Sequence, residues 1–310
     1  MKNIFKILFL GTPDFALASL ESIYKSKHHL CGVVTSPDKK HGRGQKLNFS
    51  PVKEYCIKKN IKLIQPHNFH DKQFIKVIKS YNADVFIVVA FKILPKKVWI
   101  IPKLGTINIH ASLLPNLRGA APINWAIIYG LNETGLTSFF LDDGVDTGDI
   151  IAQIKTEINV KDDFDTLYKK LKDLSGNFIL ETLENLGKRR KQHHKKTLLT
   201  APKLNKTNTR INWSDEGEKI YLKVKGLSTS PGAWSVIKET NKKIIIYDAI
   251  FHHGLNEFKN GEIFIINNDK LMISVKNGAL EIISLKVEGK NKINGIDFIN
   301  ANKNNKIKLI

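Results

Sequence analysis

Asn108, His110 and Asp146 are the residues of this 310-residue chain whose types and spacing could do chemistry together. Asn108 and His110 lie two residues apart at the end of an apolar run, so in a strand their side chains would share one side. A neutral imidazole beside a carboxylate can accept a proton from an attacking amine. An amide NH₂ can donate to the oxygen that becomes negative when a carbonyl carbon turns tetrahedral. The three residues therefore suit transfer of a carbonyl-containing group to an amine.

Each member of this trio also has a plainer interpretation. A lone histidine at a strand end is more often structural than catalytic. The acidic loop Asp142–Asp149 would equally suit a hydrated turn or a cation site. The spacing of Asn108 and His110 lowers the odds of coincidence, but the trio alone does not decide between these interpretations.

The first 190 residues alternate apolar runs with amphipathic stretches, which predicts a doubly wound, Rossmann-like α/β domain with a mostly parallel sheet. Ligands of such sheets bind beyond the carboxyl ends of the strands, where His110, the acidic loop and the segment GTPDFA (11–16) would lie. The predicted strands are Phe5–Leu10, Leu30–Thr35, Asp84–Phe91, Leu104–His110 and Glu133–Leu141, and the predicted helices are Phe15–Ser26 with Asp14 at its N-cap, Lys53–Lys59, Ile123–Tyr129 and Phe164–Leu186.

After Asn212 the pattern changes to short strand-like segments separated by Asn, Gly and Asp turns. Such spacing predicts a small OB-like β-barrel, a fold that often binds nucleic acid. We therefore predict a catalytic domain at 1–190, a basic linker at 191–206 and a C-terminal barrel at 207–310. The five predicted strands of the barrel are Ala233–Ile237, Lys243–Ala249, Glu262–Ile266, Leu271–Val275 and Leu280–Leu285.

The composition indicates a globular chain that could attract polyanions. Lys and Arg number 49 against 29 acidic residues, a net charge of +20, which favours capture of nucleic acid. A general richness in Lys, Asn and Ile would raise the charge without any partner, so charge alone leaves that partner at even odds. Two distant cysteines, Cys31 and Cys56, indicate neither a disulfide framework nor a structural metal and suit a cytoplasmic setting. No run approaches the roughly 18 apolar residues of a membrane span, and Lys6 interrupts the N-terminal run, which we interpret as a strand and not a signal peptide.

Several longer motifs carry a family resemblance. INIHASLLPNLRGAAPINWAI (107–127) is followed by DDGVDTGDII (142–151), with GTPDFA before them and GRGQKLNFSPVK (42–53) between. LTAPKLNKTNTRINW (199–213) and SPGAW (230–234) extend the match toward the C-terminus. On these motifs the chain resembles the methionyl-tRNA formyltransferase family over nearly its whole length.

The resemblance implies a formyltransferase-type fold, with Asn108, His110 and Asp146 as the catalytic trio. It implies 10-formyl-tetrahydrofolate as the one-carbon donor, initiator methionyl-tRNA as the acceptor, no metal and no membrane, and we expect a monomer. Arg43 and Lys46 match a basic insertion that reaches the tRNA. The residues that the resemblance places against the folate are Ser112, Leu113, Leu114, Pro115, Phe91, Ile93, Leu94, Asp143 and Val145.

One departure and several rivals stay open. The family pattern AYG-x-ILP is here AFKILP (90–95), one residue shorter and without the glycine, which shortens the presumed pterin wall. The rival enzymes are a formyltransferase of an amino sugar or other small amine and a 10-formyl-tetrahydrofolate hydrolase. A nicotinamide-binding domain fits poorly, because GTPDFA has one glycine where a dinucleotide loop needs three. A non-catalytic RNA-binding protein would interleave basic and stacking aromatic residues, whereas Trp213, Tyr221, Trp234 and Tyr247 are scattered as in a core. Arg118 suits either packing or phosphate steering.

Overall fold

The computed structural model describes the chain except residues 1–3, 42–45, 194–197, 256–257 and 303–306. Of residues 40, 41, 46 and 47 it describes the backbone only. The chain forms two compact units, each assembled from separate segments. The first unit comprises residues 1–119, 134–156 and 168–200, and the second comprises 120–133, 157–167 and 201–310.

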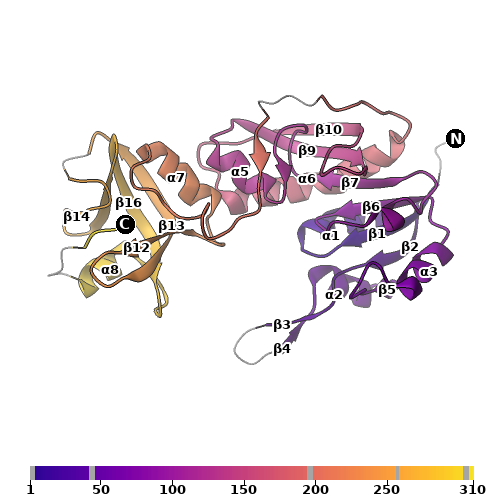
Figure 1. Ribbon diagram of the computed structural model, residues 1–310, viewed down its shortest axis with the longest axis horizontal. Coiled ribbons are helices and arrows are strands. Elements are labelled where there is room, and N and C mark those ends of the chain that lie inside the picture. Colours follow the sequence, from indigo (N-terminus) through magenta and orange to yellow (C-terminus); the bar gives the residue numbers. More distant parts are fainter. Residues whose placement is uncertain (1–3, 42–45, 194–197, 256–257, 303–306) are drawn as a thin grey trace. The chain divides into compact units, whose positions relative to one another are not determined.

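A seven-stranded sheet is the centre of the first unit (Figure 1), in the order β10-β9-β7-β6-β1-β2-β5. Strands β5, β2, β1, β6 and β7 run parallel to one another, and β9 is antiparallel to β7. The predicted mostly parallel α/β sheet is therefore confirmed, with an antiparallel side. The strands are β1 (Lys6–Gly11), β2 (His29–Val34), β5 (Leu63–Ile64), β6 (Val85–Val89), β7 (Thr106–His110), β9 (Glu133–Phe140) and β10 (Ile150–Glu157).

Helices cover the sheet because its strands are apolar on both sides. Leu8, Leu10 and Phe86 pack in a core cluster with Phe74 of α3 and Val98 of α4. Helices α1 and α6 approach each other closely, since a Cβ added to Gly176 would lie 2.8 Å from the Ser22 hydroxyl. The helices of this unit are α1 (Phe15–Lys25), α2 (Pro51–Lys58), α3 (Lys72–Ser80), α4 (Lys96–Trp99) and α6 (Phe164–Glu184), whose first turn belongs to the second unit.

Asp14 occupies the N-cap position of α1, as predicted, but its side chain does not cap the helix. Its carboxylate accepts hydrogen bonds from the Tyr168 hydroxyl and from Lys172 Nζ, the latter at 2.7 Å. A charged partner outweighs a backbone N–H as a donor, which explains why the predicted cap is not made.

The second unit is built on an antiparallel sheet in the order β12-β13-β16-β15-β14, with β17 pairing β16 (Figure 1). All five predicted strands are present, and the sequence did not predict the short β17. Trp213, Ile220 and Leu280 belong to its apolar core. The strands are β12 (Ala233–Ile237), β13 (Lys242–His253), β14 (Ile263–Ile266), β15 (Lys270–Val275), β16 (Gly278–Val287) and β17 (Lys292–Asn294), and the helices are α5 (Pro122–Ile128), α7 (Gly217–Gly226) and α8 (Gly295–Ala301).

Helix α5 packs on α7 within this unit. Gly226 lies so close to α5 that an added Cβ would be 2.6 Å from Ile128, and its carbonyl accepts from Asn124 Nδ2 at 2.8 Å. The helix predicted at Ile123–Tyr129 therefore exists but is grouped with the second unit instead of the first. In the part of the chain that the structure describes, no helix is long and apolar enough to cross a membrane.

Candidate active site

His110 ends β7 and is buried, with 6% of its surface exposed. Its Nε2 lies 2.8 Å from the carbonyl oxygen of Leu117. A carbonyl oxygen can only accept, so Nε2 carries a hydrogen and Nδ1 is the nitrogen that can gain or lose a proton. Nδ1 lies 3.7 Å from Oδ2 of Asp146. The structure thus brings together the imidazole and carboxylate that the sequence proposed as partners.

Asp146 lies in the loop between β9 and β10, with its backbone in the left-handed region at φ 56°. Its carboxylate accepts a hydrogen bond from Gly119 N at 2.9 Å. A Cβ added to Gly148 would lie 1.7 Å from the Phe140 carbonyl oxygen, so only glycine fits there. Asp142 closes the loop by accepting from Gly144 N and from Thr147 Oγ1. The spacing DxGxDTGD is therefore a geometric requirement for presenting the Asp146 carboxylate.

Asn108 lies two residues before His110 on β7 and is half-buried. Its register partners are Val88 of β6 and Phe139 of β9, which place it in the middle of the sheet. The Asn108 side chain makes no hydrogen bond to another residue within the described parts of the chain. Its amide NH₂ is thus available to a substrate oxygen.

The segment after β7 is held by buried hydrogen bonds. Thr137 Oγ1 donates to the Ser112 carbonyl at 2.6 Å and accepts from Leu114 N at 3.0 Å. The Ser112 hydroxyl donates to the Asn116 carbonyl, and Leu114 packs on Phe139. The sequence did not predict the role of Thr137, although a polar residue inside the apolar run LTSFF was a signal for it. Ser112 and Leu114 are buried, whereas Leu113 and Pro115 are half-buried.

The two loops predicted to hold the folate are joined by an ion pair. Lys96 Nζ lies 2.7 Å from Oδ2 of Asp143. Ile93 and Val145 are exposed, at 83% and 58%. Leu94 is buried in the core, and Phe91 is half-buried with its ring 5.7 Å from that of Phe69. Of the predicted folate residues on these loops, only Ile93, Asp143 and Val145 therefore present largely exposed side chains.

The predicted RNA-binding insertion is a hairpin of β3 (Lys39–His41) and β4 (Lys46–Asn48). Arg43 lies outside the described residues, and Lys46 is described by its backbone only. The base of the hairpin is anchored by Asp38, which pairs with Lys53 at 2.5 Å and accepts from Gln65 Nε2 at 2.9 Å. The hydrogen bond from Lys53, followed by that from Gln65, holds the pKa of Asp38 below its usual value.

Other chemistries find little support among the described residues. Burial raises the pKa of both thiols, Cys31 and Cys56, to about 11, which keeps them protonated and poorly nucleophilic. Within the described ranges no three His, Cys, Asp or Glu side chains are placed to hold a metal ion.

Comparison with known proteins settles the family. Residues 5–183 match the model of the formyl transferase family, and residues 203–303 match that of the formyl transferase C-terminal domain. The chain is 40% identical over 302 residues to the methionyl-tRNA formyltransferase of Flavobacterium johnsoniae and 39% identical over 304 residues to that of Fusobacterium nucleatum. Each alignment covers 96% of both chains. The chain belongs to the methionyl-tRNA formyltransferase family.

This formyltransferase also shares its fold with more distant solved structures. HypX from Aquifex aeolicus in complex with tetrahydrofolic acid is 20% identical, with a TM-score of 0.65 over 96% of this chain and 47% of that one. WlaRD, a sugar 3N-formyl transferase, is 21% identical, with a TM-score of 0.65 over 93% of this chain and 100% of that one. The likeness extends to both units of the formyltransferase, so the second unit belongs to the shared fold. The chain is accordingly a one-carbon group transferase.

Proposed function

We propose that the enzyme transfers the formyl group of 10-formyl-tetrahydrofolate to the α-amine of methionyl initiator tRNA. The observation that carries this proposal is the approach of His110 Nδ1 to Asp146 Oδ2 at 3.7 Å. Asn108 lies two residues before His110 on the same strand. All three groups lie where β7 and β9 lead into their loops, which is where open α/β sheets bind ligands.

In the proposed reaction the neutral amine attacks the formyl carbon, so a C–N bond forms and the formyl oxygen becomes negative. Asn108 and the Nδ1–H of protonated His110 donate hydrogen bonds to that oxygen, because the Nε2–H is already bound to the Leu117 carbonyl. The Asp146 carboxylate, 3.7 Å from Nδ1, balances the charge of the imidazolium. The tetrahedral intermediate then collapses, the bond from the formyl carbon to N10 of the folate breaks, and N10 receives the proton that the amine has lost.

The folate slot is proposed to lie between the segment after β6 and the Asp142–Val145 loop. The ion pair of Lys96 and Asp143 joins these two walls. Exposed Ile93 and Val145 supply apolar surface of the kind that a flat ring system covers. Ser112, Leu113, Leu114 and Pro115 would form the third side, where the buried members act through the backbone. The shortened segment AFKILP follows β6, and its first residue, Ala90, has a left-handed backbone conformation at φ 47°.

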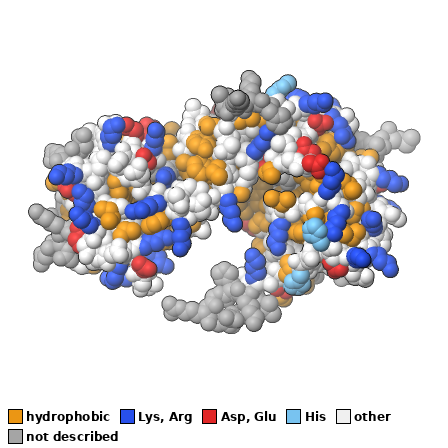
Figure 2. All heavy atoms as spheres, viewed as in Figure 1, with side chains coloured by type: hydrophobic (Ala, Val, Ile, Leu, Met, Phe, Trp, Pro, Cys, Tyr) orange, Lys and Arg blue, Asp and Glu red, His pale blue; other side chains and the backbone are white. Residues whose placement is uncertain are grey.

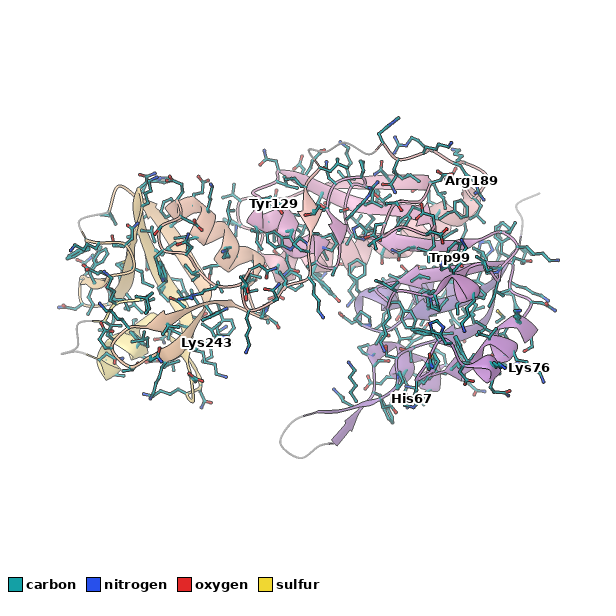
Figure 3. All side chains as sticks on the ribbon, viewed as in Figure 1. His67, Lys76, Trp99, Tyr129, Arg189 and Lys243 are labelled. Atoms are coloured by element: carbon teal, nitrogen blue, oxygen red, sulfur yellow. The ribbon has the colours of Figure 1, made fainter. Side chains whose placement is uncertain are left out.

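The tRNA is proposed to contact both the hairpin, through Arg43 and Lys46, and the sheet of the second unit. On β12 and β13, Trp234 and Tyr247 are half-buried, unlike the buried Trp213, and both have cations over their rings. Lys243 lies 4.8 Å from the Trp234 ring centroid (Figure 3), and Lys292 lies 4.8 Å from that of Tyr247. Interleaved cations and aromatic faces suit a nucleic-acid strand. In this scheme residues 1–190 catalyse, 191–206 link, and 207–310 bind tRNA.

The decisive experiment is incubation with 10-formyl-tetrahydrofolate and methionyl initiator tRNA, with detection of formyl-methionyl-tRNA. Uncharged initiator tRNA and methionyl elongator tRNA are the controls. Formate release without RNA would indicate a hydrolase instead, and formylation of an amino sugar at a comparable rate would indicate the small-amine enzyme. We also propose that the enzyme is cytoplasmic. Because the trio comes from one chain, we propose that the monomer is active, and sedimentation of the enzyme under assay conditions can check its oligomeric state.

A further inference from the structure

Asp146 has a left-handed backbone conformation, and groups from outside its loop bind both its carboxylate and its carbonyl oxygen. A residue with a Cβ in the left-handed region costs roughly 1–2 kcal/mol, and the neighbouring Asp142, Asp143 and Val145 are exposed. Such a conformation persists only where surrounding groups impose it. The surrounding groups here come from two segments elsewhere in the chain, Leu117–Gly119 and Arg190–Gln192.

Gln192 holds the backbone of this loop from one side. It is 8% exposed, and its Nε2 donates to the carbonyl oxygens of Asp146 at 3.1 Å and Gly148 at 2.7 Å. Its Oε1 accepts from Arg118 through Nη2 at 2.5 Å and Nε at 3.2 Å. Two carbonyls can only accept and a guanidinium can only donate, so these partners fix the orientation of the amide unambiguously.

The segment Leu117–Gly119 holds the two catalytic side chains from the other side. The Leu117 carbonyl accepts from His110, Gly119 N donates to the Asp146 carboxylate, and the Arg118 side chain orients Gln192. Three consecutive residues thus touch the imidazole, the carboxylate and the amide that supports the carboxylate's backbone. This contact also answers the open question about Arg118, which positions Gln192.

Gln192 is itself fixed by its neighbours in the chain. Arg190 and Ile150 exchange two backbone hydrogen bonds, Ile150 N to Arg190 O at 2.8 Å and Arg190 N to Ile150 O at 2.9 Å. The segment after α6 is thereby tied to the first residue of β10, next to the Asp146 loop. The sequence predicted a basic linker at 191–206, and within it the Gln192 side chain is buried.

We infer that Gln192, oriented by Arg118, is a positioning residue for the formyl transfer: it holds the backbone of Asp146 so that the carboxylate faces His110. This inference rests on the proposed role of Asp146 and adds to it a residue outside the segment 5–183 that the catalytic-domain model matches. Because both ends of the Gln192 amide are bound to protein groups, its loss is expected to affect the chemical step more than substrate binding.

Gln192→Met tests this inference, since methionine keeps the length and apolar stem but has no amide donor. We expect kcat to fall about tenfold, as a small misplacement of a catalytic group does, with KM for either substrate changed less than about threefold. Gln73→Ala, at an exposed position of α3, is the matched control and should behave as wild type.

A double-mutant cycle with Asp146→Asn separates positioning from general structure. If Gln192 acts through Asp146, then Gln192→Met has little further effect in the Asp146→Asn background. Fully multiplied losses would overturn the inference, as would a Gln192→Met enzyme with normal kcat beside an impaired Asp146→Asn enzyme. Wild-type turnover of Asp146→Asn would instead remove the proposed catalytic role itself. If Gln192→Met does not fold, the same cycle with Arg118→Lys decides, because lysine keeps the charge and loses the two-nitrogen grip on Gln192.

Discussion

The reaction centre of the first unit and the sheet of the second unit hold polar groups in opposite ways. His110, Asp146 and Gln192 are buried or nearly so, and each is bound by fixed protein groups. Lys243 and Lys292 instead lie beside aromatic rings above an apolar core. The first arrangement makes function depend on single hydrogen bonds between buried groups, whereas the second makes it depend on where a few cations lie beside aromatic rings.

The part of the chain that is proposed to bind tRNA carries less net positive charge than the rest. Residues 207–310 carry 16 basic and 11 acidic residues, a net +5, whereas residues 1–206 carry 33 and 18, a net +15. Basic side chains are spread over the visible surface of both units and are not gathered in one patch (Figure 2). If the second unit binds tRNA, it must do so through the placement of a few cations beside aromatic rings and not through bulk charge.

The sharpest test of the first arrangement is Asp146→Asn. The amide keeps the shape of the carboxylate but cannot hold a charged imidazole, so we expect single-turnover formylation to slow on the order of 10²-fold or more. Asp173→Asn, which removes an exposed carboxylate from α6, should leave the rate unchanged. A rate for Asp146→Asn within a few-fold of wild type would contradict the proposal that formyl transfer depends on the Asp146 carboxylate.

The second unit also contains buried hydrogen bonds around Ser235, and their loss should lower stability and not activity. Ser235 Oγ accepts from Trp213 Nε1 and donates to the Ile310 carbonyl, both at 2.8 Å. Ser235→Ala leaves Trp213 Nε1 without its partner, whereas the Ile310 carbonyl keeps its hydrogen bond from Val236 N. We expect a loss of about 2 kcal/mol in the free energy of unfolding, the cost of one buried unpaired donor. Ser214→Ala, on the surface, serves as the control in the same denaturant titration. An unchanged midpoint for Ser235→Ala would show that water replaces the lost partner.

The sequence predicted most strands and the trio because both are local patterns. Period and apolarity are enough to place β6 and β7, and two-residue spacing is enough to place Asn108 and His110 on one side. Gln192 could not be found this way, because its role depends on contact with residues 146 and 148, some 45 positions earlier. The basic residues around it also predict a solvated segment.

Tertiary context likewise explains the other misses. Helix α7 begins and ends with glycine, which sequence rules assign to a loop, yet its glycines permit close packing on α5 and on Phe251. Trp234 and Tyr247 were interpreted as core, because strand alternation alone does not show which side of a sheet faces its core. The antiparallel direction of β9 depends on the path of the chain through α5, which no local pattern encodes.

Lys243 and Lys292, the cations beside Trp234 and Tyr247, allow a test of whether their placement matters for tRNA binding, with a smaller expected effect. We expect Lys243→Ala and Lys292→Ala each to weaken binding of initiator tRNA several-fold and to reduce the slope of log affinity against log salt by about 1. Lys76→Ala on α3 removes the same charge from the first unit and should have a smaller effect (Figure 3). Equal effects of all three substitutions would favour bulk charge over placement.

Asp14 is neither buried like His110 nor fully exposed. Its half-exposed carboxylate accepts hydrogen bonds from Tyr168 and Lys172. Burial alone would raise its pKa, but hydrogen bonds from Lys172 and Tyr168, with the Lys172 charge, hold the pKa below the ordinary value of 3.8. A depressed pKa in the folded state stabilises the fold above pH 3.8, and this contribution disappears as the pH falls through the folded pKa.

We therefore expect Asp14→Asn to lower the thermal midpoint by about 1–2 °C at pH 6, the size of effect of a partly exposed ion pair. Near pH 3 the difference should shrink, because the carboxylate of the unfolded chain, with the ordinary pKa of 3.8, then binds a proton more readily than that of the folded chain. Thermal unfolding at the two pH values measures this directly. A difference of equal size at both pH values would mean that Asp14 contributes through packing and not through its charge.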